Sequence, residues 1–177
     1  MALDSALQNI NIIYLAGGCF WGVQAYFDRV QGVVESEVGY ANSIVPNPSY
    51  ELVCSGYTNA AEALRLVFNA EILTLPEIFA RFFSIVDPTL LNKQGNDEGT
   101  QYRSGIYAQE NAVLDNARDF IMRYIAPKYV ADICTEVCLL QNFYPAESYH
   151  QKYLDKNPHG YCHIDIMGAS RPIHFKE

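Results

Sequence analysis

A cysteine that directly follows two glycines is the residue of this sequence with the clearest potential for chemistry. The segment Gly17-Gly18-Cys19 stands where a short apolar run, residues 10–16, gives way to apolar residues at helical spacing. The first N–H groups of a helix are unpaired and its dipole is positive there, so a thiolate at this position is stabilised and its pKa falls. The glycines allow a sharp turn and leave the sulfur accessible. Cys19 is therefore predicted to be a nucleophile.

Two aromatic residues follow this cysteine, Phe20 and Trp21, and the latter is the only tryptophan of the chain. The competing interpretation is a buried cysteine at the head of a core helix. The coincidence of a Gly-Gly turn, a helix start and an aromatic pair favours a nucleophile that lies beside an aromatic wall.

A carboxyl group is the second candidate. In the expected strand 62–69, Glu62 has the same parity as Leu64, Leu66 and Phe68, whereas Arg65 has the opposite parity. A carboxyl on the apolar face loses solvation, which raises its pKa and makes it a proton donor near neutrality. The alternative is a solvated residue at the frayed start of the strand.

Tyrosines are the third group of candidate site residues, and the chain contains thirteen of them. Tyr40, Tyr50 and Tyr102 fall in or beside long loops, where a phenolic hydroxyl can hold a polar oxygen without carrying charge. Together with a thiol, a protonated carboxyl and an aromatic wall, these hydroxyls suit a substrate with a small apolar group beside a strongly polar oxygen.

The elements that must position these residues alternate along the chain. A short apolar run predicts a buried strand over 10–16, strand-like patterns predict others over 33–40, 62–69, 104–108 and 133–139, and helical spacing begins at Phe20. Thr74 and Glu77 form a capping-box pair that opens a helix through 86. Helical patterns recur over 113–124 and 147–155, and loops over 41–49, 92–105 and 155–160. This mixture predicts an α/β or α+β class and one domain over 1–177.

Composition narrows the function classes. Twelve basic against twenty acidic residues give a net charge of −8, which disfavours nucleic acid and anionic membranes as partners. Five cysteines are too few, and odd in number, for a secreted disulfide scaffold. The uncharged stretch 5–27 is interrupted by polar residues and glycines and lacks a basic leader. The expectation is a cytoplasmic protein without a membrane span.

A series of short motifs runs from about Ile12 to Ile166. The motifs are Gly18-Cys19-Phe20-Trp21-Gly22, Val38-Gly39-Tyr40, Asn47-Pro48-Ser49-Tyr50, Val53-Cys54-Ser55-Gly56, Ala61-Glu62-Ala63, Asp87-Pro88-Thr89, Gln94-Gly95-Asn96-Asp97, Gly99-Thr100-Gln101-Tyr102-Arg103-Ser104, Asn142-Phe143-Tyr144-Pro145-Ala146-Glu147, Tyr149-His150-Gln151-Lys152-Tyr153-Leu154, Asn157-Pro158 and Gly160-Tyr161-Cys162. In this order they resemble the A-class peptide methionine-S-sulfoxide reductases, the MsrA family.

The resemblance implies a role for each matching position. Cys19 would attack the sulfoxide sulfur. Glu62, with Tyr50 and Tyr102, would bind and protonate the sulfoxide oxygen, which then leaves as hydroxyl. The products would be methionine and a sulfenic acid on Cys19, the reversible first step of cysteine oxidation.

The same resemblance implies a binding site and a fold. Phe20 and Trp21 would enclose the substrate methyl group, and Asp97 would organise the site or hold the substrate backbone. The family fold is a two-layer α/β sandwich with a ferredoxin-like core, a mixed sheet and a long C-terminal coil, in agreement with the mixed pattern above.

Cys162 would resolve the sulfenic acid to a disulfide, which thioredoxin or another dithiol would reduce. It lies between Gly160 and Gly168, in a segment expected to reach Cys19. The resemblance implies no metal and no organic cofactor. The expected partners are thioredoxin and peptides or proteins that contain methionine sulfoxide, with repair of oxidised proteins as the role and a monomer as the expected state.

Some positions depart from the family pattern. Asn59-Ala60 replaces a frequent Gly-His before the Ala-Glu pair, and Ser43-Ile44 replaces a frequent Gly-Gly. The missing histidine bears on how the acid is tuned.

The remaining cysteines are interpreted as packing residues. Cys134 and Cys138 would face one side of the strand 133–139, where four residues span about 13 Å, too far for a disulfide. Cys54 lies in a matching motif without assigned chemistry. The four histidines, which are His150, His159, His163 and His174, lack zinc-site spacing with the cysteines. His150 and His159 are expected to form hydrogen bonds in loops.

Two other function classes compete with the reductase. A non-catalytic redox sensor would signal through oxidation of Cys19, but it needs no acid aimed at a substrate oxygen. A thiol peroxidase would use Cys19 on peroxide, but it leaves the aromatic methyl pocket without a purpose.

Overall fold

Six strands form one sheet in the order β7-β6-β1-β3-β2-β8. The structure, a computed structural model, describes residues 9–174. The strands are β1 (Ile10–Ala16), β2 (Val33–Ala41), β3 (Ala61–Asn69), β6 (Gly105–Ala108), β7 (Glu136–Leu139) and β8 (Phe143–Pro145). Neighbours are antiparallel except β6 and β7, which are parallel. A separate two-stranded ribbon joins β4 (Lys93–Gln94) to β5 (Asp97–Glu98).

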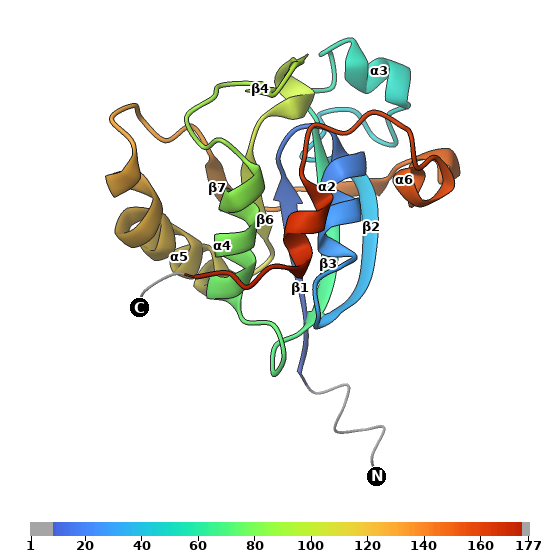
Figure 1. The fold of residues 1–177 in the computed structure, drawn as a ribbon. Coiled ribbons are helices and arrows are strands. Elements are labelled where there is room, and N and C mark those ends of the chain that lie inside the picture. The colour runs from blue at the N-terminus through green and yellow to red at the C-terminus, as the bar shows by residue number, and fades with distance from the viewer. Residues whose placement is uncertain (1–8, 175–177) are drawn as a thin grey trace.

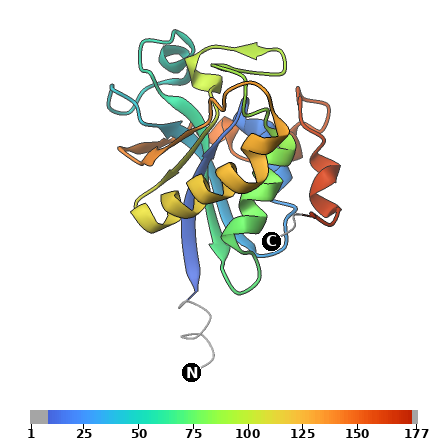
Figure 2. The same cartoon turned by 90° about the vertical axis from the view of Figure 1, so that its left-hand side faces the viewer.

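The central strands have the connectivity of a ferredoxin-like core. The chain runs from β1 through α2 (Phe20–Phe27) to β2, and from β3 through α4 (Leu75–Ile85) to β6. The resulting order β6-β1-β3-β2 places two β-α-β units side by side. In Figure 1, α2 and α4 lie in front of the sheet, and Figure 2 shows α5 (Asn111–Phe120) beside α4. The predicted two-layer sandwich is confirmed.

The main core lies between the sheet and these helices. Fully buried side chains of β1 and β3, such as Leu15 and Leu64, pack with Phe27 of α2 and Phe79 of α4. Removal of such side chains from water is the main favourable contribution to folding. The opposite face carries a smaller cluster around Tyr14 and Tyr107.

Several local predictions are confirmed. β1 has the predicted bounds, and β2, β3 and β6 agree within one residue. Thr74 is the N-cap of α4, and its hydroxyl accepts a hydrogen bond from the Glu77 N–H at 3.4 Å. The Glu77 carboxylate does not close the capping box, because it accepts a hydrogen bond from Arg81 at 3.1 Å instead.

Three predicted elements need correction. β7 begins only at Glu136, so Cys134 is not on a strand and does not share a face with Cys138. The helix predicted over 113–124 ends as α5 at Phe120 and continues as a π-helical turn over Ile121–Ile125. The helix predicted over 147–155 is two short turns, Ser148–His150 and α6 (Tyr153–Lys156), because Lys152 between them has a φ of +53°.

The C-terminal coil returns to the helices. Its 3-10 turn, Ile166–Ser170, packs on α2. The buried Arg81 guanidinium of α4 donates a hydrogen bond to the Ala169 carbonyl at 3.0 Å, which ties the coil to the core. Among residues 9–174, no helix is long and apolar enough to cross a membrane.

Candidate active site

Cys19 is the N-cap of α2, in the turn that joins β1 to α2. The turn before it depends on Gly18, whose φ of +78° lies in the left-handed region that favours glycine. The Gly18 N–H donates to the Tyr102 carbonyl at 3.3 Å, which joins this turn to the 3-10 turn Thr100–Tyr102. The predicted strand, turn and helix around Cys19 are confirmed.

The predicted lowering of the Cys19 pKa is wrong for the resting protein. The residue is only 8% exposed, and burial raises the pKa of its thiol above the ordinary value. The nearby Glu62 and Asp97 carboxylates raise it further, and a hydrogen bond from the Trp21 N–H lowers it by less. Desolvation thus outweighs the helix N-terminus. Cys19 rests as a neutral thiol.

Glu62 lies on β3, directly behind the first turn of α2. It is 2% exposed, and its Oε2 accepts a hydrogen bond from the Phe20 N–H at 3.1 Å. Burial raises the pKa of Glu62 to about 8, with a smaller contribution from Asp97. The predicted apolar-face position and raised pKa are confirmed, so this carboxyl holds a proton at neutral pH.

The departure at Asn59-Ala60 leaves this acid without a neighbouring histidine. Asn59 adopts a φ of +53°, and Ala60 is buried with its N–H donated to the Thr58 hydroxyl at 3.1 Å. These residues shape the loop that leads into β3. Among the described residues, the Phe20 N–H is the group that donates a hydrogen bond to Glu62.

Tyr50 and Tyr102 come from two different loops. Tyr50 begins α3 (Tyr50–Cys54), which Ser49 caps by accepting a hydrogen bond from the Leu52 N–H at 3.2 Å. Burial raises the pKa of both phenols, and the Glu62 charge raises it further. Both hydroxyls therefore stay protonated near Glu62 and can donate hydrogen bonds to a polar oxygen.

Asp97 lies on the β4–β5 ribbon at the edge of this group. Its Oδ2 accepts a hydrogen bond from the Tyr161 hydroxyl at 3.0 Å. Its charge raises the pKa of Cys19, Glu62 and Tyr102. Tyr161 was not predicted as a site residue, although its position beside Cys162 in the sequence was a signal.

Phe20 and Trp21, in the first turn of α2, both pack against His150. Phe20 is 1% exposed, and its ring centre lies 5.2 Å from that of His150. Trp21 is half-buried, stacks on Tyr153 with ring centres 3.7 Å apart, and donates its indole N–H to His150 Nδ1 at 3.0 Å. His150 is thus buried and accepts a hydrogen bond from Trp21, which confirms the expectation that His150 forms hydrogen bonds.

Cys162 lies against the first turn of α2. A Cβ added at Gly22 would lie 3.1 Å from its sulfur, and the thiol is positioned to donate to the Ile164 carbonyl at 3.2 Å. Residues three apart on a helix are neighbours on its surface, so Gly22 lies one turn beyond Cys19. The structure therefore brings Cys162 close to Cys19 while both thiols are free.

Glu147 is the supporting residue that the sequence reasoning missed. Its carboxylate accepts hydrogen bonds from the Tyr40 hydroxyl at 2.8 Å and from the Tyr50 N–H at 3.1 Å. These bonds lower its pKa, although partial burial opposes them. Glu147 thereby ties α3, which carries Tyr50, to β2, which carries Tyr40.

We expect Glu147→Ala to lower the free energy of unfolding by about 1–3 kcal/mol, because two donors lose a charged acceptor. The loss should shrink as the pH falls through the depressed pKa of Glu147, since protonation already weakens these bonds in the unmodified chain. Urea unfolding at pH 7 and pH 4 measures both effects. Glu98→Ala is the control, because its exposed pair with Lys93 contributes little. Equal losses for the two variants would contradict the role of Glu147.

The other cysteines differ in their surroundings. Cys54 is exposed on α3, so the prediction that it is a packing residue is wrong. Cys138 packs against the smaller cluster, as expected. The thiol of Cys134, which is half-buried, is positioned to donate to the Thr89 carbonyl at 3.4 Å. Within residues 9–174, no group of three or more potential ligands is arranged to hold a metal ion.

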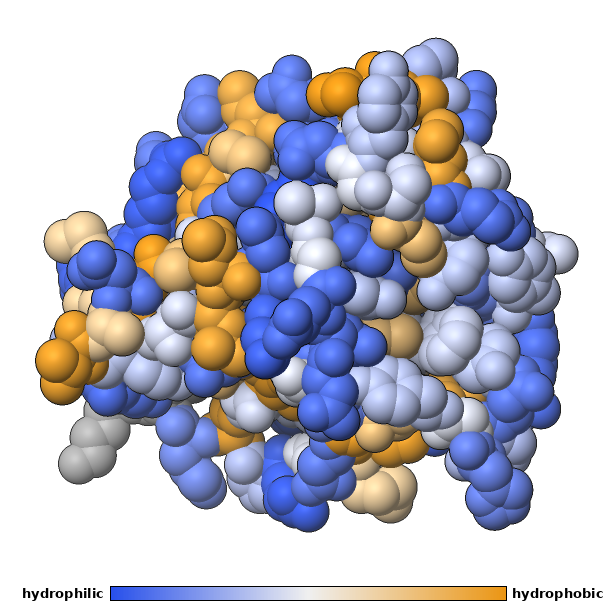
Figure 3. All heavy atoms as spheres, turned by 90° about the horizontal axis from the view of Figure 1, so that it is seen from above, coloured by the Kyte–Doolittle hydropathy of each residue, from blue (hydrophilic) through white to orange (hydrophobic). Residues whose placement is uncertain are grey.

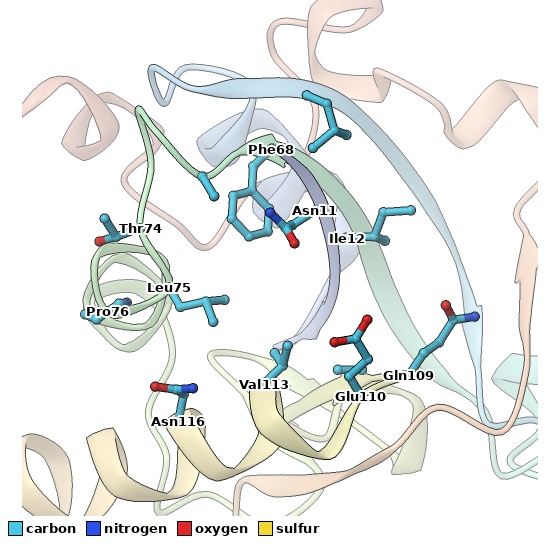
Figure 4. A pocket seen from close by; sticks show the side chains of 13 residues that line it. Asn11, Ile12, Phe68, Thr74, Leu75, Pro76, Gln109, Glu110, Val113 and Asn116 are labelled. Atoms are coloured by element: carbon cyan, nitrogen blue, oxygen red, sulfur yellow. The ribbon is translucent and has the colours of Figure 1, made fainter. Parts of the chain in front are cut away.

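The site lies at the end of the molecule that carries the loops, and a pocket lies far from it. Seen from above, the end of the molecule that carries the loops is mostly hydrophilic with scattered apolar side chains (Figure 3). A pocket of about 520 Å³ lies instead at the start of β1, between Phe68, Leu75 and Val113 (Figure 4). It is about 20 Å along β1 from Cys19 and contains none of the predicted site residues.

Comparison with known proteins agrees with this arrangement. The family model "Peptide methionine sulfoxide reductase" matches residues 11–176. A peptide methionine sulfoxide reductase MsrA of Clostridium botulinum is 52% identical over 158 residues, which cover 87% of this chain and 98% of the relative. The chain spans nearly the full length of that relative.

Solved structures give the same result. Reduced Mxr1 of Saccharomyces cerevisiae superimposes with a TM-score of 0.82 at 42% identity, over 87% of this chain and 89% of that one. Mxr1 in complex with Trx2 matches with a TM-score of 0.59 at 28% identity, over 82% and 85% of the two chains. The chain therefore belongs to the peptide methionine sulfoxide reductase family, as a thiol-dependent oxidoreductase of the MsrA class.

Proposed function

We propose that this protein reduces methionine S-sulfoxide, free or in peptides and proteins, by direct attack of Cys19 on the sulfoxide sulfur. The observation that carries the proposal is the protonated Glu62 carboxyl, bound to the Phe20 N–H directly behind Cys19. A nucleophile with a proton donor beside it is what oxygen transfer from a sulfoxide requires. Repair of oxidised proteins follows as the role of this chemistry.

The first step transfers oxygen from substrate sulfur to enzyme sulfur. Cys19 attacks the sulfoxide sulfur, and Glu62 protonates the sulfoxide oxygen. The proton of the thiol then restores the carboxyl. The products are methionine and a sulfenic acid on Cys19, so atoms and electrons balance without a metal or an organic cofactor.

The pKa of the Cys19 thiol depends on the protonation state of Glu62. Glu62 raises the Cys19 pKa only when it is ionised, so the protonated carboxyl leaves the thiol easier to deprotonate. Tyr50 and Tyr102 donate hydrogen bonds to the polarised oxygen and stay neutral while they do so. The site stabilises charge that develops on the oxygen, as an oxyanion hole does.

We assign substrate binding to Phe20 and Trp21 and to Asp97 of the β4–β5 ribbon. Trp21, fixed by His150 and Tyr153, forms with Phe20 the wall against which the substrate methyl group packs. Asp97 lies at the edge, where a peptide N–H of the substrate can donate to its carboxylate.

The second step regenerates the enzyme. The Cys162 thiol condenses with the sulfenic acid of Cys19 to form a disulfide and water, and a dithiol such as thioredoxin then reduces the disulfide by exchange. The short path from Cys162 past Gly22 to Cys19 supports this pairing. The solved complex of yeast Mxr1 with Trx2 supports thioredoxin as the reductant.

We expect Cys162→Ser to separate these two steps. The variant should form one methionine per enzyme in a single turnover, since Cys19 and Glu62 are intact, and should then stop when thioredoxin is the reductant. Quenched-flow measurement of methionine, followed by steady-state turnover, checks both expectations. Cys138→Ser is the matched control. Unchanged turnover with thioredoxin would show that another thiol resolves the sulfenic acid.

The reaction itself is tested with the separate S and R epimers of a methionine sulfoxide peptide. Turnover of only the S epimer, with dithiothreitol and with thioredoxin, is expected. Activity with dithiothreitol alone would keep the reaction but reject Cys162. Failure with both epimers would reject the reductase in favour of a redox sensor, and a faster reaction with hydrogen peroxide would favour a thiol peroxidase.

A further inference from the structure

The ring of His163, the residue after Cys162, fits closely into a space beside Gly18 and Gly95, which is called the seat below. The His163 side chain is only 11% exposed, whereas its neighbour Tyr161 is 42% exposed as a whole residue. A Cβ added at Gly18 would lie 2.9 Å from two atoms of the His163 ring, and one added at Gly95 would lie 3.2 Å from His163 Cβ. The ring therefore fills space that two glycines leave open, one of them next to Cys19.

Shape rather than hydrogen bonding holds the ring in this seat. Both ring nitrogens are buried and without a hydrogen-bond partner among the described residues. The nearest charged group is the Asp97 carboxylate, 3.9 Å from Nδ1. Burial lowers the pKa of His163, so the ring is neutral and forms no ion pair there at neutral pH.

The seat has a direct consequence for Cys162. Residues 161–163 belong to neither a helix nor a strand, and their side chains point to different sides. Tyr161 and His163 both face the β4–β5 ribbon, through Asp97 and Gly95. Cys162 points the other way, onto Gly22 of α2.

The packing around the coil is not uniform. A hollow of about 580 Å³ lies beside it, lined among others by Gly95, His163, Ile164 and Arg171. Polar or aromatic side chains fix this coil at the His163 seat, at the hydrogen bond from Tyr161 to Asp97 and at the hydrogen bond from Arg81 to Ala169. The seat and the Tyr161 bond both adjoin Cys162, and of these the seat reaches Gly18, the residue before Cys19.

We propose that His163 is a positioning residue for the resolving step: its ring, seated between Gly18 and Gly95, holds the Cys162 thiol against the first turn of α2. A thiol held there reacts with the sulfenic acid on Cys19 at a high effective concentration. The Cys162 proton and the sulfenic hydroxyl leave as water, and one S–S bond forms. The inference rests on the proposed role of Cys162.

The experiment follows both steps in one sample. Reduced enzyme is mixed with excess methionine sulfoxide and no reductant, and samples are quenched to measure methionine and the Cys19–Cys162 disulfide. We expect His163→Ala to form methionine at the rate of the unmodified enzyme but to form the disulfide about tenfold more slowly, because Cys162 is no longer held in place. His163→Phe, which fills the seat without ring nitrogens, should restore the disulfide rate. His159→Ala, at an exposed position of the same coil, is the control.

Each outcome decides between the alternatives. An unchanged disulfide rate in His163→Ala overturns the inference, and so does a His163→Phe variant as slow as His163→Ala. An equal loss of methionine and disulfide formation also overturns it, because His163 then acts on the whole site. If the unmodified enzyme forms methionine but no Cys19–Cys162 disulfide, the proposed role of Cys162 fails rather than the seat. The methionine burst reports in every case whether the variant is folded.

Discussion

Cys19→Ser should abolish sulfoxide reduction, with a loss on the order of 10⁴-fold or more, as for the removal of other catalytic nucleophiles. A serine hydroxyl is far less acidic and less nucleophilic than a thiol, and its oxygen cannot form the sulfenic acid that stores the transferred oxygen. The substitution keeps the N-cap position, because serine is itself a favoured N-cap residue. The fold should therefore be retained or slightly stabilised.

Two measurements check this expectation. Methionine is measured after a long incubation with dithiothreitol, and circular dichroism with thermal unfolding confirms that the variant is folded. Cys134→Ser, which replaces a thiol away from the site, is the matched control and should keep full activity. Turnover by a folded Cys19→Ser variant would show that Cys19 is not the nucleophile.

Glu62→Gln should lower the rate of methionine formation by about 10²–10⁴-fold, the usual contribution of a general acid. Glutamine has nearly the same shape and can still accept the hydrogen bond from the Phe20 N–H, but it cannot give a proton to the sulfoxide oxygen. The loss should appear in kcat more than in KM. Glu35→Gln, which alters an exposed carboxylate paired with Arg65, is the control.

The pH dependence gives this prediction a second signature. The folded pKa of Glu62 is about 8, so single-turnover activity of the unmodified enzyme should fall as the pH rises through 8, where the acid loses its proton. The Glu62→Gln variant should lack that descent. An identical descent in both would assign the ionisation to another group.

Glu62→Gln should raise stability while it lowers activity. A carboxyl with a raised folded pKa keeps its proton while the unfolded chain has lost it, so the free energy of unfolding falls as the pH rises from about 4.5 towards 8. Glu62→Gln removes this penalty. Its melting temperature relative to the unmodified chain should therefore increase over that interval, the stability gain expected when a catalytic group is neutralised.

Local features of the site were predictable from the sequence because short-range rules govern them. The apolar run, the two glycines and the helical spacing after Cys19 predict its turn correctly, and strand parity alone places Glu62 on the buried face. The β-α-β-β-α-β order also follows once each element is recognised. These inferences need no knowledge of which segments meet.

The features that failed depend on contacts between distant segments. The helix start at Cys19 favours a low pKa, but burial among segments that meet only in the fold reverses the sign. Cys54 was expected inside, yet α3 lies on the surface. The bonds of Glu147 to Tyr40 and Tyr50 span about a hundred residues, and the seat of His163 pairs it with Gly18, so sequence spacing gives no signal for either.

The burial of the Cys19 thiol also limits unwanted reactions. Alkylating agents and hydrogen peroxide react with thiolates, and their rates fall with the thiolate fraction. A thiol kept neutral by burial and by the Asp97 carboxylate is therefore a poor target for small electrophiles in the absence of substrate. In the proposed mechanism, only a sulfoxide that places its oxygen against Glu62 supplies the proton acceptor that makes attack favourable. The resting enzyme thus stays unmodified under the same oxidising conditions that generate its substrate.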